Sequence, residues 1–343
     1  MDLSEHLSFL DISLAPATWN SIKSRKDVST SVDMAGETLQ VPLLASNMTS
    51  VYSPKLAHEL ARMGGRAVVP RFYDVETNIR LFKEGIYGTI KPWVSCGLGE
   101  VEYERAITLE EAGAGVIIID VANAACDDAA EQFVKLRRNT DFHIIVGNFA
   151  AFAQYQTFMD KVRGCMPPDA VKLGVGQSRV CQTRMVTGVG YPALSTLLDF
   201  KGKGVKVICD GGMSNSGDLA KALACGADVM MSGSLFAATQ ESNAEVHYEW
   251  DDEMKKLKKF KKHYGSASNT AYKEQGKMSY FRTAEGIESL LPISGTVEQL
   301  VNNLMGGLRS AMTYTNSLNL NQLKEVKFSR ISNASYLEGL PRP

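Results

Sequence analysis

A cysteine on a glycine-containing loop is the residue best suited to chemistry in this sequence. Gly174 and Gly176 precede Cys181 on that loop, and Arg179 and Arg184 flank it. Glycines let a backbone turn sharply and present its amide groups or carbonyls. Nearby positive charge favours the thiolate form of a cysteine, which is the nucleophilic form. The loop therefore indicates a nucleophilic cysteine, with an incidental loop cysteine as the alternative.

Two glycine-rich turns further along the chain are suited to binding a phosphorylated ligand. Asp210 is followed by Gly211 and Gly212, and Gly233 is followed by Ser234. In α/β barrels, turns of this kind after the seventh and eighth strands bind phosphate through backbone N–H groups and a helix N-terminus. The Asp210 carboxylate is suited to accept hydrogen bonds from ribose hydroxyls. A phosphate site is predicted here, and two ordinary tight turns are the alternative.

These residues follow short apolar runs that are typical of buried parallel strands. Most of the runs are continuously apolar rather than alternating, as expected of strands covered on both faces. Helix-like stretches with apolar residues at threes and fours lie between them, for example at 53–63, 103–112, 129–138 and 216–224. The predicted strands are 41–47, 65–71, 91–97, 115–123, 142–148, 169–176, 205–212 and 227–234.

Eight strand–helix units in a row predict an α/β fold, a closed (β/α)8 TIM barrel, with an open doubly wound sheet as the alternative. We expect a single domain over residues 1–343, with longer loops after the sixth and eighth strands. Those loops would lie on the carboxyl face, where barrel enzymes place catalytic residues. A lysine-rich stretch within residues 251–263 is interpreted as a solvated helix face, and a nucleic-acid or polyphosphate contact is the alternative.

Composition and charge exclude several classes of protein. The 343 residues are 44% hydrophobic and 22% charged, and 37 Lys plus Arg against 38 Asp plus Glu give a formal net charge of −1. That balance provides no general attraction to nucleic acid or to an anionic membrane. No apolar run approaches the roughly 18–20 residues of a membrane span, and the first residues lack the cationic lead of a signal peptide. Six cysteines without a CxxC pair and five histidines without ligand spacing argue against disulfides and zinc sites. We therefore expect a cytoplasmic protein with reduced thiols.

Several motifs, taken in order, resemble the IMP dehydrogenase/GMP reductase family from about residue 10 to about residue 323. Two features are similar to the reductase branch. Residues 82–90 run directly into the third strand, with no regulatory CBS insertion, and the segment between Tyr264 and Glu285 is too short for the dehydrogenase flap. The stretch 306–314 also resembles the reductase form. The motifs that carry the resemblance are 120–123, 147–148, 174–183, 187–192, 210–212, 264–265 and 282–286.

The resemblance implies an NADPH-dependent enzyme that converts GMP to IMP with loss of ammonia. By the match, Cys181 forms a covalent thioimidate with C2 of the purine, which suits a soft nucleophile. Thr183 and Glu285 match the pair that moves the proton to the departing amine. Arg71 stands where the reductase has a catalytic lysine. The resemblance also implies a mobile active-site segment at 254–290 and a C-terminal tail at 324–343.

The resemblance also implies which residues contact the ligands. Ser24 and Arg25 match residues given to a neighbouring subunit's cofactor, so a homo-oligomer, commonly a tetramer, is expected. The backbone carbonyls of Gly174, Gly176 and Cys181 match a potassium site. The remaining cofactor positions are Asp120, Val121, Ala122, Ser310 and Thr313. The positions matching contacts to the purine nucleotide are Arg179, Asp210, Gly211, Gly212, Gly233, Ser234, Tyr264, Gly265, Ser266, Arg282 and Gly286.

The sequence departs from the reductase pattern at several of these positions. Arg71 replaces a lysine, Arg179 replaces a phosphate-contacting serine, Thr49 replaces an aspartate and Ser266 replaces a methionine. Arg is not a neutral replacement for Lys, because its charge is spread over a plane and it keeps its proton. At position 179 an arginine can instead bind phosphate bidentately. Three alternatives therefore stay open: another purine nucleotide as substrate, an IMP dehydrogenase, and a catalytically silent nucleotide-binding protein.

Overall fold

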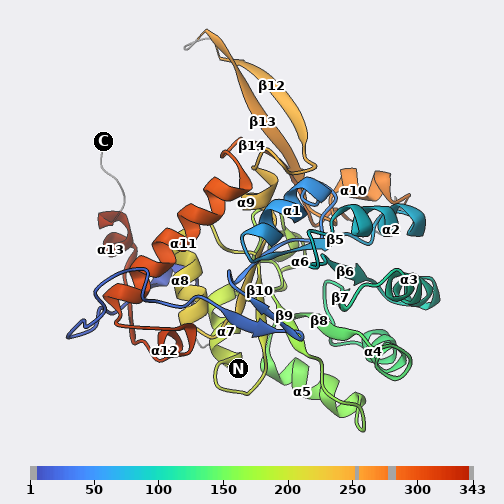
Figure 1. Ribbon diagram of the computed structural model, residues 1–343, viewed down its shortest axis with the longest axis horizontal. Helices are drawn as coiled ribbons and strands as arrows, with labels where there is room; N and C mark the ends of the chain where they lie inside the picture. The colour runs from blue at the N-terminus through green and yellow to red at the C-terminus, as the bar shows by residue number, and fades with distance from the viewer. Residues whose placement is uncertain (1–5, 252–254, 277–282, 340–343) are drawn as a thin grey trace.

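Eight parallel strands close into a barrel at the centre of the computed structural model, which describes residues 6–251, 255–276 and 283–339 (Figure 1). The strands are joined in the order β10-β11-β4-β5-β6-β7-β8-β9, and β9 pairs with β10 to close the ring. The prediction of a (β/α)8 barrel is confirmed. The barrel strands are β4 (Leu43–Ala45), β5 (Arg66–Val69), β6 (Trp93–Cys96), β7 (Val116–Asp120), β8 (His143–Phe149), β9 (Ala170–Leu173), β10 (Val207–Asp210) and β11 (Val229–Ser232).

Most observed strands are shorter than the predicted apolar runs. The predicted strand at 65–71 is observed as Arg66–Val69, so Arg71 lies past its end. The predicted strand at 205–212 is observed as Val207–Asp210, and Gly211 and Gly212 follow it with positive φ. A backbone with positive φ cannot continue a strand, so the ends of these runs become the loops at the carboxyl end of the barrel.

The barrel interior is a packed apolar core that is closed at one end. Leu44, Ile118 and Ile208 belong to one buried cluster inside the ring of strands. Met34 and Leu39 belong to the same cluster, and they come from a hairpin formed by β2 (Val32–Met34) and β3 (Glu37–Leu39). Because strands in parallel barrels are covered on both faces, the interior holds side chains and no channel.

Helices surround the barrel, and four of them, α1, α2, α8 and α11, begin at side-chain caps. Ser53 accepts a hydrogen bond from the Leu56 amide at the start of α1, and Asn215 accepts one from the Asp218 amide at the start of α8. Such caps satisfy amides that have no partner within the helix. The surrounding helices are α1 (Pro54–Arg62), α2 (Val75–Glu84), α3 (Glu100–Glu111), α4 (Asp127–Asn139), α5 (Phe152–Lys161), α7 (Ala193–Phe200), α8 (Ser216–Ala224) and α11 (Val297–Tyr314).

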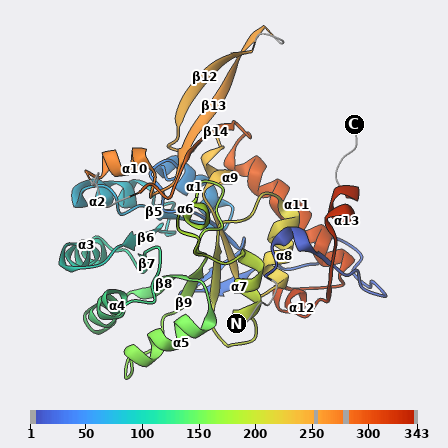
Figure 2. The ribbon, with the colours of Figure 1, turned by 180° about the vertical axis from the view of Figure 1, so that it is seen from behind.

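Two insertions lie at the carboxyl end of the barrel, as expected. The first, after β9, contains the short helix α6 (Thr183–Thr187). The second, after β11, contains α9 (Ser234–Ala237), β12 (Glu245–Asp251), β13 (Lys256–Tyr264), α10 (Asn269–Glu274) and β14 (Glu288–Pro292). Strands β12, β13 and β14 form an antiparallel sheet, and the β12–β13 hairpin projects away from the barrel (Figure 1; Figure 2).

The helix expected within residues 251–263 is wrong, because the lysine-rich stretch forms strand β13. Three of its five lysines pair across the sheet with acidic residues of β12, as Lys258 does with Glu249, while Leu257 pairs with Trp250. Opposite charges and apolar side chains placed across from each other stabilise an antiparallel pair. An ion pair of 2.9 Å between Lys262 and Glu288 adds a similar contact to β14.

The first and last strands of the chain pair beside the barrel. Strand β1 (Ile12–Leu14), which follows a short helix at Phe9–Asp11, pairs antiparallel with β15 (Phe328–Arg330). The segment expected to be a C-terminal tail thus contributes a strand. It also holds α13 (Asn333–Glu338), and α12 (Leu320–Lys324) ends at its start. Within the described ranges, no helix combines the length and apolar character that a membrane crossing requires.

Candidate active site

A cavity of about 580 Å³ opens at the carboxyl ends of the barrel strands. That size lies within the range of small-ligand sites, and the location is where barrel enzymes bind substrate. Its walls come from the ends of six strands and from both insertions. The predicted site residues that line it are Asp120, Ala122, Gly174, Gly176, Arg179, Cys181, Thr183, Asp210, Gly211, Gly212, Gly233, Ser234, Gly265, Ser266, Glu285 and Gly286.

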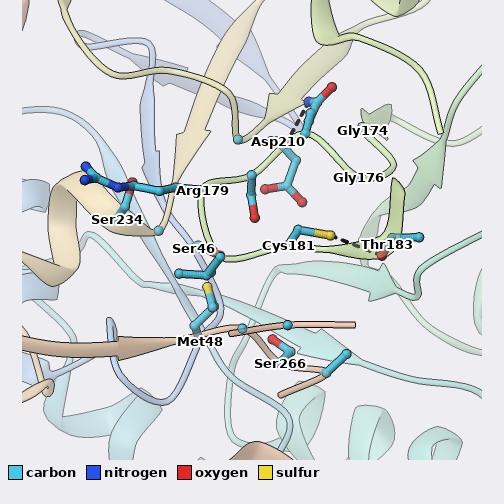
Figure 3. A pocket seen from close by; sticks show the side chains of 18 of the residues that line it. Ser46, Met48, Gly174, Gly176, Arg179, Cys181, Thr183, Asp210, Ser234 and Ser266 are labelled. Carbon is cyan, nitrogen blue, oxygen red and sulfur yellow. Dashed lines mark hydrogen bonds between the residues drawn. The ribbon is translucent and has the colours of Figure 1, made fainter. Parts of the chain in front are cut away.

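Cys181 and Thr183 face each other at this cavity (Figure 3). Their Sγ and Oγ1 atoms are 3.2 Å apart. The loop that carries Cys181 reverses direction at Gly174 (φ 142°) and Gly176 (φ 78°), and helix α6 then starts at Thr183. A hydroxyl beside a sulfur can donate or accept a hydrogen bond, so the pair is arranged to exchange a proton.

Glu285 reaches the same cavity because two distant segments of backbone cross. The amide of Gln182 donates to the Glu285 carbonyl at 2.6 Å, and the amide of Ile287 donates to the Val180 carbonyl at 3.0 Å. These bonds place Cys181 opposite Gly286 as in a two-stranded ladder. Cys181, Thr183 and Glu285 are thereby held at one cavity by main-chain hydrogen bonds.

Glycine is required where these segments cross. A side chain at Gly265 would lie 2.9 Å from the Val180 carbonyl oxygen and 3.2 Å from the Gly286 Cα. A side chain at Gly286 would lie 3.1 Å from the Ser268 amide nitrogen. These separations are closer than ordinary van der Waals contact, so the two backbones approach only because neither residue has a Cβ.

The other buried thiols differ from Cys181 in their surroundings. All six cysteines lie in the described part of the chain and are free, and Cys96, Cys209 and Cys225 are buried. Burial raises the pKa of the Cys96 and Cys209 thiols well above the usual range. It raises the pKa of Cys225 to about 11. Cys181 is instead half-buried and is the cysteine that lines the cavity, so its thiol is the one that a ligand in the cavity can reach.

A buried charge cluster forms the floor of the cavity. Lys172, 2% exposed, lies 2.7 Å from Asp120 Oδ1 and also pairs with Asp210. Burial alone would raise the pKa of Asp120, but the Lys172 ammonium and the Asn47 amide outweigh it, and the pKa is lowered. Burial alone would lower the pKa of Lys172, but the two carboxylates outweigh that effect and raise it. Ammonium and carboxylate therefore stay charged together.

The opposite side of the cavity is suited to an anion. Arg179 extends beside Ser234, away from Cys181, with Asp210 between the two sides (Figure 3). His263 also lines the cavity, and its Nδ1 lies 2.9 Å from Ser50 Oγ. Burial, and secondly the charge of Arg179, lower the pKa of His263 to about 4. The imidazole is thus neutral near pH 7, and Arg179 provides the positive charge at this side.

Some predicted site residues lie away from the cavity. Among the described residues, its lining does not include Arg71, whose guanidinium stacks over the Phe72 ring at 4.6 Å. Tyr264 lines a neighbouring cavity of about 360 Å³, and its hydroxyl oxygen lies 3.3 Å from Thr49 Oγ1. Val121 also lies outside the lining, although its backbone bonds to β8. Arg282 falls outside the described residues.

The predicted cofactor residues of helix α11 and of the N-terminal segment also lie outside the cavity lining. Ser310 and Thr313 are on α11, where their hydroxyls bond to the carbonyls of Gly306 and Arg309 at 2.9 Å. Ser24 and Arg25 lie on the N-terminal segment between β1 and β2, and Arg25 is exposed. Their placement leaves them accessible to another molecule.

Comparison with known proteins shows which family and which proteins this chain is similar to. Residues 6–342 match the IMP dehydrogenase / GMP reductase domain. A protein named GMP reductase from Photobacterium profundum is 33% identical over 340 residues, covering 95% of this chain and 94% of that protein. One of the same name from Shewanella halifaxensis is 34% identical with the same coverage. The chain belongs to the IMP dehydrogenase / GMP reductase family. The family resemblance seen in the motifs is confirmed.

Sequence reasoning gave no role to several residues that the structure places in this family member's site. Lys172, Asn148 and Asn47 form the polar floor, and His263 lies at the anion side. One signal was present for Lys172, because it is the charged residue within the apolar strand β9. A buried charge needs a partner of opposite sign, so its strand position alone predicts nearby carboxylates.

We predict that iodoacetamide at pH 7.5 modifies Cys181 and the exposed Cys126 in the native protein, at least about tenfold faster than Cys96, Cys209 or Cys225. The buried thiols are protonated and inaccessible, whereas alkylation requires an accessible thiolate. Peptide mass spectrometry measures each rate, and the same reaction in denaturant, where all sites should react, is the control. Modification of Cys209 as fast as Cys181 in the native protein would contradict the assignment.

Proposed function

We propose that the protein catalyses the NADPH-dependent reductive deamination of GMP to IMP and ammonia, in the cytoplasm. The observation that carries the proposal is that Cys181, Thr183 and Glu285 line one cavity of nucleotide size. Its relatives named GMP reductase, which are 32–34% identical along almost the whole chain, support the same substrate.

The cavity orients a nucleotide by its polar groups. Arg179 and Ser234 are suited to the 5′-phosphate, because a guanidinium can bind phosphate oxygens bidentately. Asp210 lies between them and Cys181 (Figure 3) and is suited to the ribose hydroxyls. Met48 and Ser266 line the cavity near the thiol and would contact the purine. The base would then present C2 to Cys181.

The reaction begins when the Cys181 thiolate adds to C2 of the purine, forming a C–S bond. The C2–N bond to the exocyclic amino group then breaks, and ammonia leaves as a thioimidate forms. The amino group must gain a proton to leave, and Thr183, 3.2 Å from the thiol, together with Glu285 would deliver it.

The nicotinamide cofactor, when bound, supplies a hydride to C2. The C–S bond then breaks, IMP is released and the Cys181 thiolate is regenerated. Two of the residues predicted to contact this cofactor, Asp120 and Ala122, line the cavity. Ser310 and Thr313 lie outside it, and we propose that they also contact the cofactor. Ser24 and Arg25 lie outside it too, and we propose that they contact the cofactor of a neighbouring subunit in a homotetramer.

A potassium ion is proposed at the loop before Cys181. Gly174 and Gly176 turn the backbone there, so carbonyl oxygens can converge, and neutral oxygens are suitable ligands for this cation. The Gly174 carbonyl already accepts a hydrogen bond from Asn148 at 2.6 Å. The Gly176 and Cys181 carbonyls would therefore provide the main protein contacts.

A second candidate is the same chemistry on another purine nucleotide. The observation that favours it is the altered surround of the base: Ser266 lines the cavity, Thr49 bonds to Tyr264, and Arg71 lies outside the cavity lining. These positions would decide which substituents on the purine ring are accepted. The Cys181, Thr183 and Glu285 arrangement would be unchanged.

We predict that Cys181→Ala abolishes NADPH oxidation with GMP while the affinity for GMP stays within roughly tenfold of the wild type, because the nucleophile acts mainly on chemistry. Loss of absorbance at the NADPH band measures turnover, and calorimetric titration measures affinity. Cys126→Ala, which removes an exposed thiol on another loop, is the matched control and should turn over normally.

The same assay separates the alternatives. Oxidation of NADPH only with a different 2-amino purine nucleotide would replace GMP as the substrate and keep the mechanism. NAD reduction with IMP would indicate a dehydrogenase. Nucleotide binding without turnover on any of these substrates would indicate a silent binding protein, and turnover by Cys181→Ala would contradict the thioimidate step.

We further predict that Arg25→Met raises the KM for NADPH by about tenfold or more and leaves the KM for GMP unchanged, since a charged contact to the cofactor would be lost. Differently tagged Arg25→Met and Cys181→Ala subunits, co-expressed and purified through both tags, should regain activity. A site with an intact Cys181 then receives Arg25 from its neighbour. Mixed assemblies no more active than either variant alone would contradict a shared site.

A further inference from the structure

Lys172 is a fully buried lysine at the centre of the cavity floor. Its side chain is 2% exposed, and its neighbours in β9 are apolar and buried. Its Nζ lies 2.7 Å from Asp120 Oδ1 and pairs with Asp210 Oδ2. An ammonium group inside a barrel needs such partners, because burial of an unpaired charge is strongly unfavourable.

Gly147, on the strand next to Lys172, leaves the space that the lysine side chain occupies. A Cβ added to Gly147 of the adjacent strand β8 would lie 2.4 Å from the Lys172 Cβ and 2.7 Å from its carbonyl oxygen. Any side chain at 147 would therefore displace the base of the lysine. The position of Lys172 is thus fixed by its backbone neighbour as well as by its two ion pairs.

The two carboxylates that Lys172 joins are not equivalent. Both oxygens of Asp120 are occupied, Oδ1 by Lys172 and Oδ2 by the Asn47 amide at 2.8 Å. In Asp210, Lys172 and the Asn148 amide both approach Oδ2. Within the described part of the chain, no side chain or amide donates to Asp210 Oδ1, and Asp210 lines the cavity. Asp120 therefore holds Lys172 in place, whereas Asp210 keeps one carboxylate oxygen that can accept a hydrogen bond from a ligand.

We propose that Lys172 is a positioning residue for nucleotide binding: it holds the Asp210 carboxylate oriented so that Oδ1 accepts hydrogen bonds from the ribose hydroxyls, while Asp120 holds Lys172 from the other side. The inference rests on the proposed function, since it takes the ligand to be a purine ribonucleotide. Lys172 itself does not touch the ligand. Its effect is confined to the sugar, and it makes no contribution to the bond changes at Cys181.

The test compares GMP with its 2′,3′-dideoxy analogue by calorimetric titration of the full-length wild type, Lys172→Met and Lys172→Arg. The wild type should bind GMP about tenfold or more tightly than the analogue, because hydroxyl hydrogen bonds to a carboxylate are lost with the analogue. Lys172→Met should lose most of this preference and bind the analogue within about threefold of the wild type. Lys172→Arg keeps a positive charge and should retain the preference.

A general structural role for Lys172 would weaken both ligands equally and leave their ratio unchanged. A wild-type ratio in Lys172→Met would therefore overturn the inference, as would a wild type that does not distinguish the two ligands. If the wild type does not bind GMP at all, the proposed function is overturned instead. The two failures are thus separated within one experiment.

A second variant covers the case in which Lys172→Met does not fold, since it leaves two partly buried carboxylates without their ammonium partner. Lys172→Met combined with Asp120→Asn removes one positive and one negative charge, so the cluster keeps its net charge. Asp210 still lacks its lysine in this variant. The preference for GMP should again be lost, and its retention in a folded double variant, checked by circular dichroism, would overturn the inference.

Discussion

The site depends on the crossing of two backbone segments that are distant in the sequence. The loop around Cys181 and the segment around Glu285 exchange main-chain hydrogen bonds, and Gly265 and Gly286 allow the close approach. The thiol and the carboxylate belong to separate insertions of the barrel, and this crossing brings them to one cavity. Main-chain bonds are also insensitive to the side chains around them. This explains how the arrangement persists although the residues at positions 49, 71, 179 and 266 depart from the reductase pattern.

Charge is arranged along the cavity in a way that matches the parts of a nucleotide. One side has Arg179, with His263 kept neutral by burial and by that same arginine. The floor has two carboxylates and one ammonium, Asp210, Asp120 and Lys172, which together carry a net negative charge. A ligand with an anionic end and a hydroxyl-bearing middle is complementary to this arrangement of charges along the cavity. Such complementarity fixes the orientation of a bound ligand and the specificity of the site.

Much of the fold was predictable because buried parallel strands leave a continuous apolar signal. Every barrel strand falls within its predicted run apart from Phe149 at the end of β8, and two of the runs end at glycines with positive φ, Gly176 and Gly212. The prediction of a helix at 251–263 was wrong for a physical reason. Lysines of strand β13 face acidic residues of strand β12, and the register of that pairing cannot be known from the lysine-rich stretch alone. That Cys181, Thr183 and Glu285 share one site was predictable by resemblance, and the three residues do line one cavity. The positions of Lys172 and His263 depend instead on neighbours from other strands.

The proposed reaction requires Cys181 to bond covalently to C2 of a purine nucleotide. The most direct measurement is mass spectrometry of the peptide that contains Cys181, after acid quenching during turnover with GMP and NADPH. The account predicts that part of this peptide gains the mass of GMP less that of ammonia, and that this form is absent from Cys181→Ala. An unmodified peptide at every quench time from a wild type that is oxidising NADPH would contradict it.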